Sequence, residues 1–149
     1  MEDIYTELYI HLIIAVKFRN ALITDDYREV LHKYITGGVQ DEGHKMLAIN
    51  SVEDHLHFFI GMNVEKTISD LMRDIKKEST KFINKNFMVD SKFQWQVGYG
   101  AFSYSKNQID SVVKYILNQR EYHKKVKFRD EFIQTLKNYE VEYEEKYLF

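Results

Sequence analysis

The stretch MLAINSVEDHLHFFIGM, residues 46 to 62, indicates the fold class of this 149-residue chain. Two apolar runs, residues 46–52 and 55–62, flank a short acidic pair, which is typical of a β-hairpin. His55 and His57 are two positions apart on the second predicted strand, so their side chains leave the same face of the sheet. Leu56, Phe58 and Ile60 are apolar and leave the other face. One face of the hairpin is therefore predicted to pack in a core and the other to carry polar chemistry.

The segments around this hairpin complete the predicted sheet. Residues 5–18 are rich in aliphatic and aromatic residues without a helical period, which predicts a strand buried on both faces. Cap chemistry at residues 24–26 and helical apolar spacing then predict a helix that ends at the Gly37-Gly38 pair. After the hairpin, apolar positions from Ile68 to Ile83 predict a second helix. Residues 93–103 predict a fourth strand with a bulge at its glycines.

The resulting order, β-α-β-β-α-β, is the ferredoxin-like split βαβ arrangement of the α+β class, with a four-stranded antiparallel sheet. An apolar stripe from Ile109 to Leu117 predicts a further helix, and a weaker stripe from Phe128 to Leu136 predicts a last one. The length allows one well-filled core, so we expect a single domain over residues 1–149.

Composition limits the chemistry that is available. The chain has no cysteine, which excludes disulfides, thiolate metal sites and cysteine nucleophiles, so a metal site must use His, carboxylates, amides or water. No apolar run approaches the ~18 residues needed to cross a bilayer, and the start is acidic, unlike a signal peptide. We therefore expect a cytoplasmic protein without a membrane partner.

The net charge of -2 argues against a nonspecific polyanion binder, because phosphate affinity comes mainly from Lys and Arg. Basic residues nevertheless cluster locally. The residues predicted to contact DNA are Arg73, Lys77 and Lys81 on the second predicted helix, and Lys114, Arg120, Lys124 and Lys125 around and after the third. A charged helix face can also be merely solvated, and the second group is the better candidate because of its position.

Tyr115 and Gln119 are four positions apart, which makes them neighbours on one face of the third predicted helix. That face flanks the apolar stripe. When the stripe packs on the sheet, both side chains lie at the border of the packed surface and can point toward His55 and His57. Taken alone, either pair of residues has an ordinary structural explanation.

Together these features resemble the single-tyrosine HUH transposases of the smallest bacterial insertion sequences. The resemblance rests on the element order, the His55-Leu56-His57 strand, the WQVGYGAFS stretch of residues 95–103 and the Tyr115-x-x-x-Gln119 helix. It implies that His55, His57 and Gln119 hold a divalent metal and that Tyr115 is the nucleophile. It also implies cleavage of single-stranded DNA hairpins at transposon ends, a covalent 5′-phosphotyrosine intermediate, and a homodimer.

The chemistry is consistent with that assignment. A phenol has a pKa near ~10, so an unassisted tyrosine is a weak nucleophile at neutral pH. Two imidazoles and a neutral amide leave a cation nearly its full charge and open positions for phosphate and water, which favours Mg²⁺ or Mn²⁺. His11 on the first predicted strand is a general base only in principle.

Two alternatives remain open from the sequence. A nicking enzyme for plasmid or phage replication shares the two-histidine strand, although such proteins usually carry additional domains. A noncatalytic nucleic-acid-binding module on the same scaffold would leave His55 and His57 as ordinary polar residues.

Overall fold

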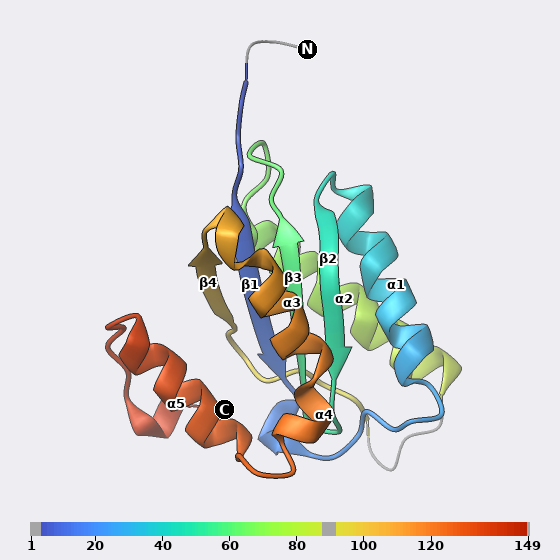
Figure 1. Cartoon of the computed structure of the whole chain (residues 1–149). Helices are drawn as coiled ribbons and strands as arrows, with labels where there is room; N and C mark the ends of the chain where they lie inside the picture. Colours follow the sequence, from blue (N-terminus) through green and yellow to red (C-terminus); the bar gives the residue numbers. More distant parts are fainter. Residues whose placement is uncertain (1–3, 88–91, 149) are drawn as a thin grey trace.

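A four-stranded antiparallel sheet forms the centre of the computed structural model, which describes residues 4–87 and 92–148. The strands are β1 (Tyr9–Ala15), β2 (Lys45–Ser51), β3 (His55–Gly61) and β4 (Gly100–Tyr104). Their order across the sheet is β2-β3-β1-β4, and β1 pairs with both β3 and β4. This is the predicted ferredoxin-like α+β arrangement, in which the two strands at the centre are β1 and β3 (Figure 1).

Helices cover both faces of the sheet (Figure 1). One face carries α1 (Arg28–Asp41) and α2 (Ile68–Asn86), and the other carries α3 (Ile109–Leu117), the short α4 (Gln119–Tyr122) and α5 (Phe128–Asn138). Three 3-10 turns occur at Lys17–Arg19, Lys106–Gln108 and Glu145–Tyr147. Among the described residues, no helix combines the length and the apolar character needed to span a membrane.

Alternation along β1 and β3 divides the interior into two packed regions. Leu12, Ile14 and Leu56 point into the larger core beneath α1 and α2. Residues at the opposite parity, such as Ile13 and Phe59, contribute to apolar clusters with α5 and α3. The same parity places His11, His55 and His57 on the α3–α5 face, where the site is built.

The first predicted helix is longer than expected. It continues through Gly37-Gly38 to Asp41, so the prediction that it ends at the glycine pair was wrong. A Cβ atom on Gly38 would lie 3.1 Å from Ile75 Cδ1, which indicates that this glycine permits close packing of α1 on α2. The residue before the helix is Tyr27, and no side chain caps it, although polar residues at positions 24–26 were expected to.

The first and fourth strands are shorter than expected. β1 begins at Tyr9, four residues after the predicted start. In the part of the predicted fourth strand that precedes β4, the described residues 93–99, only Trp95 forms a β-bridge, and this isolated bridge joins it to Val16. The Trp95 indole donates a hydrogen bond to Ser79 Oγ on α2 at 2.9 Å. The backbone beside Trp95 is also hydrogen-bonded at the end of β1, from Lys17 N to Gln94 O at 2.9 Å and from Gln96 N to Ala15 O at 2.8 Å. This part of the predicted strand therefore pairs with the end of β1 only at this bridge and also contacts the helix layer. The one register irregularity recorded in the described sheet lies between Met46 and Ala48, not at the glycines near β4.

Candidate active site

His55 and His57 lie on β3 and are buried, with 1% and 0% of their surface exposed. Each has a partner for its Nδ1 atom. His55 Nδ1 lies 2.8 Å from Asp54 Oδ1, and His57 Nδ1 lies 2.7 Å from His11 Nε2. Burial, and then the neighbouring histidines, hold the pKa of His57 well below its usual range. The two rings are therefore fixed in orientation, and the neutral form of His57 is favoured.

His11 belongs to the same buried group, and its ring centroid lies 6.2 Å from that of Tyr115. Its ring stacks on His57 with centroids 5.0 Å apart, and burial lowers its pKa to about 3. Its contact with His57 makes it a positioning residue for that ring.

Helix α3 brings Tyr115 to the histidines. Val112 and Ile116 are buried on the sheet, and α3 packs against β2 and β3. The Asn50 amide on β2 donates to the carbonyls of Ile116 and Leu117 at 3.0 and 3.1 Å, which fixes the end of the helix. The Tyr115 ring consequently lies edge-on to His57, with centroids 6.0 Å apart.

Gln119 is fully buried and begins α4, two residues beyond the end of α3. Its Oε1 atom lies 3.3 Å from His55 Nε2. The structure thus gathers the four residues that the sequence singled out for catalysis and metal binding, His55, His57, Tyr115 and Gln119, within one chain.

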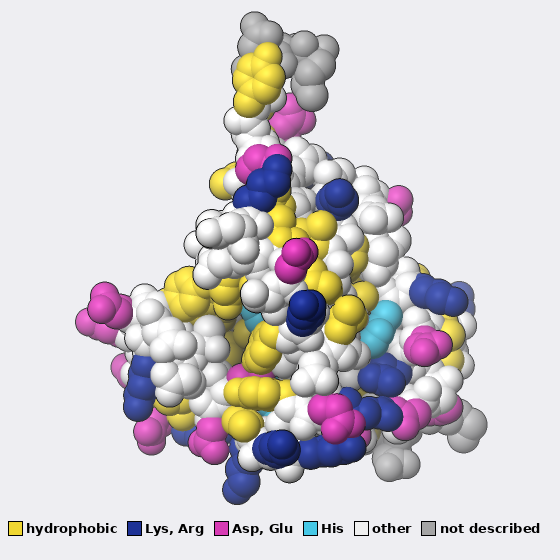
Figure 2. Space-filling model, in the orientation of Figure 1, with side chains coloured by type: hydrophobic (Ala, Val, Ile, Leu, Met, Phe, Trp, Pro, Cys, Tyr) yellow, Lys and Arg dark blue, Asp and Glu magenta, His cyan; other side chains and the backbone are white. Residues whose placement is uncertain are grey.

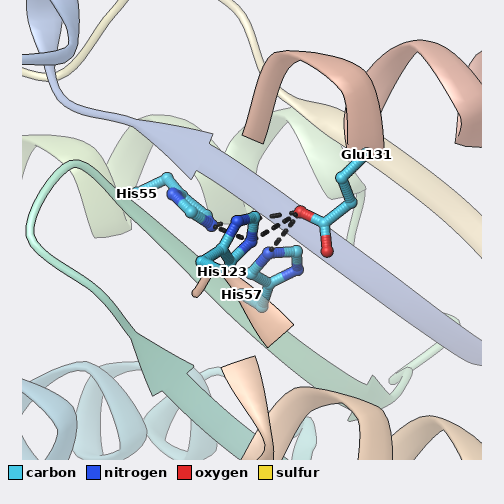
Figure 3. Close-up of side chains that lie close together, drawn as sticks. All are labelled: His55, His57, His123 and Glu131. Carbon is cyan, nitrogen blue, oxygen red and sulfur yellow. Dashed lines mark hydrogen bonds and ion pairs between the residues drawn. The ribbon is translucent and has the colours of Figure 1, made fainter. Parts of the chain in front are cut away.

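Two further residues, which the sequence did not single out, complete this group (Figure 3). Glu131 on α5 is 4% exposed and places Oε1 3.5 Å from His57 Nε2 and 3.1 Å from His123 Nε2. His123, directly after α4, places its Nε2 3.2 Å from His55 Nε2. The only sequence signal for Glu131 is a carboxylate within the apolar stripe of α5, beside Phe132.

The second oxygen of Glu131 faces the predicted nucleophile. Tyr115 donates a short hydrogen bond to Glu131 Oε2, and Gln119 Nε2 donates to the same atom at 3.1 Å. Burial raises the pKa of Glu131 to about 8. One carboxylate therefore connects the histidines, the amide and the phenol.

The donor set fits a divalent metal ion. One donor atom from each of His55, His57, His123 and Glu131 lies within 4.8 Å of the others. His57 Nε2 is a buried atom without a hydrogen-bond partner in the described residues, and it points toward Glu131 Oε1. An unpaired buried nitrogen costs free energy that a bound cation would recover.

Two cavities are lined in part by residues of this group. One, of about 340 Å³, is lined mainly by residues of α3, α4 and α5, including Tyr115, Tyr122 and Glu131. The other, of about 420 Å³, is lined by His55 and His123 together with Arg19 and Lys127. A substrate can therefore reach the tyrosine without unfolding of the core.

The basic residues fall into two groups. Arg73, Lys77 and Lys81 are exposed on α2, which covers the opposite face of the sheet, and Arg73 is already paired with Asp70 and Asp74. Lys114, Arg120, Lys124 and Lys125 are exposed on the site side, where Arg120 pairs with Asp25 and Lys124 with Glu121. Figure 2 shows Lys and Arg gathered around α4 among acidic side chains. The structure thus separates the α2 group from the site.

A family match assigns the chain to the transposases, a class of enzymes that cleave and rejoin DNA. Residues 4–119 match the model of the family described as "Transposase IS200 like", and the chain belongs to that family.

Two solved structures share the fold. A candidate transposase from Deinococcus radiodurans superposes with a TM-score of 0.65 at 21% identity, covering 80% of this chain and 95% of that chain. A REP-associated tyrosine transposase bound to a REP hairpin superposes with a TM-score of 0.63 at 17% identity, covering 85% of this chain and 75% of that chain. No curated protein matches the sequence.

Proposed function

We propose that this transposase cuts single-stranded DNA at insertion-sequence ends with Tyr115 as the nucleophile and forms a covalent 5′-phosphotyrosine. The observation that supports this most directly is the position of Tyr115. The Tyr115 hydroxyl donates a hydrogen bond to Glu131, the carboxylate that also contacts His57. Tyr115 also lines a cavity that a substrate could enter. The family membership supplies the reaction class, and the geometry supplies the candidate residues.

In the proposed reaction a bond forms between the Tyr115 oxygen and phosphorus, and the bond from phosphorus to the 3′ oxygen breaks. The phenolic proton leaves toward Glu131, the acceptor of its hydrogen bond, and the leaving oxygen takes a proton from water. The covalent bond conserves the energy of the broken phosphodiester. The 3′-hydroxyl of another strand can therefore reverse the attack and be joined without ATP.

His55, His57 and Gln119 are the proposed metal ligands, with Mg²⁺ or Mn²⁺ as the expected ion. When bound, such an ion polarises the scissile phosphate and stabilises the charge that develops on it. Asp54 and His11 hold the two imidazoles in orientation, and Glu131 holds the amide of Gln119. These contacts preorganise the ligands before DNA binds.

The proposed substrate is a DNA hairpin with an unpaired flank, as the REP-hairpin complex of the similar transposase suggests. Lys114, Arg120, Lys124 and Lys125 are the phosphate contacts that lie beside the site, and Arg73, Lys77 and Lys81 would have to reach a more distant part of the DNA. A homodimer is part of the proposal, although Tyr115 here reaches the histidines of its own chain.

The test replaces Tyr115 with phenylalanine and uses Tyr122→Phe as a matched control. Tyr122 lines the same cavity, and its ring lies 5.4 Å from that of Tyr115, but among the described residues its hydroxyl is not hydrogen-bonded to Glu131. Hairpin DNA labelled on one strand is incubated with Mn²⁺, and covalent adducts are resolved on denaturing gels. We expect Tyr115→Phe to lose the adduct while retaining DNA binding, and Tyr122→Phe to keep both.

Adduct formation by Tyr115→Phe at the wild-type level would reject Tyr115 as the nucleophile. A strand-joining assay on the same substrates separates the replication-nickase alternative, because cleavage without joining of transposon ends favours that enzyme. Absence of cleavage with every hairpin and metal would favour a noncatalytic binding module.

A further inference from the structure

Two donors of the histidine group lie outside both the family match and the proposed ligand set. The family model ends at Gln119, whereas His123 and Glu131 follow it. Both point into the group: His123 Nε2 and Glu131 Oε1 are 3.1 Å apart, and each lies close to a β3 histidine (Figure 3). The C-terminal segment of this chain therefore adds an imidazole and a carboxylate to the two histidines of β3.

The orientation of the added imidazole is fixed by the backbone. His123 Nδ1 lies 2.7 Å from the Val126 carbonyl, which can only accept, so the proton of the ring is on Nδ1 and its Nε2 presents a lone pair. His55 is arranged in the same way, with Nδ1 donating to Asp54. An imidazole that donates its far nitrogen to a carboxylate or carbonyl is the usual arrangement of a metal-bound histidine.

These tautomers make the group unfavourable without added positive charge. With one proton on each ring, the lone pairs of His55 Nε2 and His123 Nε2 face each other at 3.2 Å. Glu131 Oε1 approaches both, at 4.0 Å from His55 and 3.1 Å from His123, and His57 Nε2 has no hydrogen bond. Electron-rich atoms that converge in this way favour a bound divalent cation.

We propose that His55, His57, His123 and Glu131 form a four-donor site that binds a divalent transition-metal ion of the zinc type in preference to Mg²⁺. Three imidazoles and one carboxylate suit Zn²⁺ and similar ions, whereas Mg²⁺ prefers oxygen ligands and retains water. The inference rests on the proposed function and revises its metal site in one respect: His123 and Glu131 take the place of Gln119 as ligands, and a zinc-type ion takes the place of Mg²⁺. It also makes Glu131 the link between the ion and Tyr115.

The test is a titration of the metal-free protein with Co²⁺, followed by visible absorption, and with Zn²⁺ by competition. Co²⁺ absorbs strongly when four-coordinate and weakly when six-coordinate. We expect one equivalent to bind with strong absorption and to be displaced by one equivalent of Zn²⁺ but not by a large excess of Mg²⁺. His123→Ala and Glu131→Gln should each weaken Co²⁺ affinity by at least roughly tenfold, since loss of even an indirect partner has that effect.

The matched control is His32→Gln, which removes a half-buried histidine on α1, the helix on the opposite face of the sheet. It should bind Co²⁺ as the wild type does. Thermal melts of each metal-free variant establish that it is folded. If His123→Ala does not fold, Co²⁺ affinity is measured with Glu131→Gln alone, because glutamine keeps the shape of the glutamate side chain.

Weak six-coordinate absorption, displacement by Mg²⁺, or unchanged affinity in folded His123→Ala and Glu131→Gln would each overturn the inference. These results are separable from failure of the proposed function. If the Co²⁺ spectra are weak and six-coordinate but Mg²⁺ supports formation of the covalent adduct, the transposase mechanism stands and the four-donor site is rejected. The expected spectra without any adduct would retain the site and reject the mechanism.

Discussion

Glu131 offers one carboxylate oxygen to the histidines and the other to Tyr115 and Gln119. No pattern in the sequence connects these residues, because Glu131 lies on a different helix and reaches the group only when α5 packs on the sheet. The same holds for His123, whose orientation depends on the Val126 carbonyl. By contrast, period-two spacing on β3 and the four-residue spacing of Tyr115 and Gln119 are local features that the sequence displays.

At the residue scale, His32 provides a test of burial that is independent of the site. Its ring is hydrogen-bonded to Ser51, and burial, and then the Arg28 charge, lowers its pKa to about 4. In the unfolded chain a histidine has a pKa near ~6.5, so below that pH the unfolded state binds more protons. The stability contributed by neutral His32 is complete above pH ~6.5 and is lost as the pH falls toward about 4.

We therefore expect His32→Gln to reduce the loss of stability between pH 6.5 and 4, as measured by urea unfolding at a series of pH values. At pH 7.5 and above, the difference between variant and wild type should be constant. Parallel stability curves through the acid range would contradict the assigned protonation of His32.

Among the secondary-structure elements, the six of the β-α-β-β-α-β order were predictable because each has either a hydrophobic period or a continuous apolar run. The boundaries were less so. The segment before β4 reads as a strand from its apolar residues, but Trp95 is used to contact Ser79 and α2, and Gly98 takes a positive φ of 90°. Tertiary packing of this kind is not visible in local sequence.

Helix α5 depends on one glycine of β4. A Cβ atom on Gly100 would lie 2.8 Å from Phe132 Cε1 and 3.0 Å from Phe102 Cε2. Alanine at this position must therefore displace aromatic rings of the hydrophobic cluster through which α5 packs on the sheet. Overpacking of this kind costs about 1 to 3 kcal/mol. Displacement of α5 also moves Glu131, and we expect Gly100→Ala to lower both the melting temperature and Co²⁺ affinity.

Gly37→Ala is the matched control for that substitution. Gly37 lies within α1, where an added Cβ has nothing within 4 Å, and alanine should stabilise the helix by about 0.5 to 1 kcal/mol. If Gly100→Ala melts and binds Co²⁺ as Gly37→Ala does, α5 is not held through this contact.

In the molecule as a whole, the sheet has its larger hydrophobic core on one face and the proposed catalytic residues on the other. The larger core lies beneath α1 and α2, whereas the titratable cluster lies on the face covered by α3, α4 and α5. The residues matched by the family model, 4–119, supply the sheet, Tyr115 and Gln119. The segment after them supplies His123 and Glu131, so the complete group requires both parts of the chain.

The most direct test of the account is to map the site of DNA attachment. Trypsin cleavage after Lys114 and Arg120 places Tyr115 in the peptide YILNQR and Tyr122 in the next peptide, EYHK, so mass spectrometry of the nuclease-trimmed adduct distinguishes them. We expect a nucleotide attached to YILNQR through a 5′-phosphate. Attachment to EYHK or to any other tyrosine peptide, or through a 3′-phosphate, would contradict it.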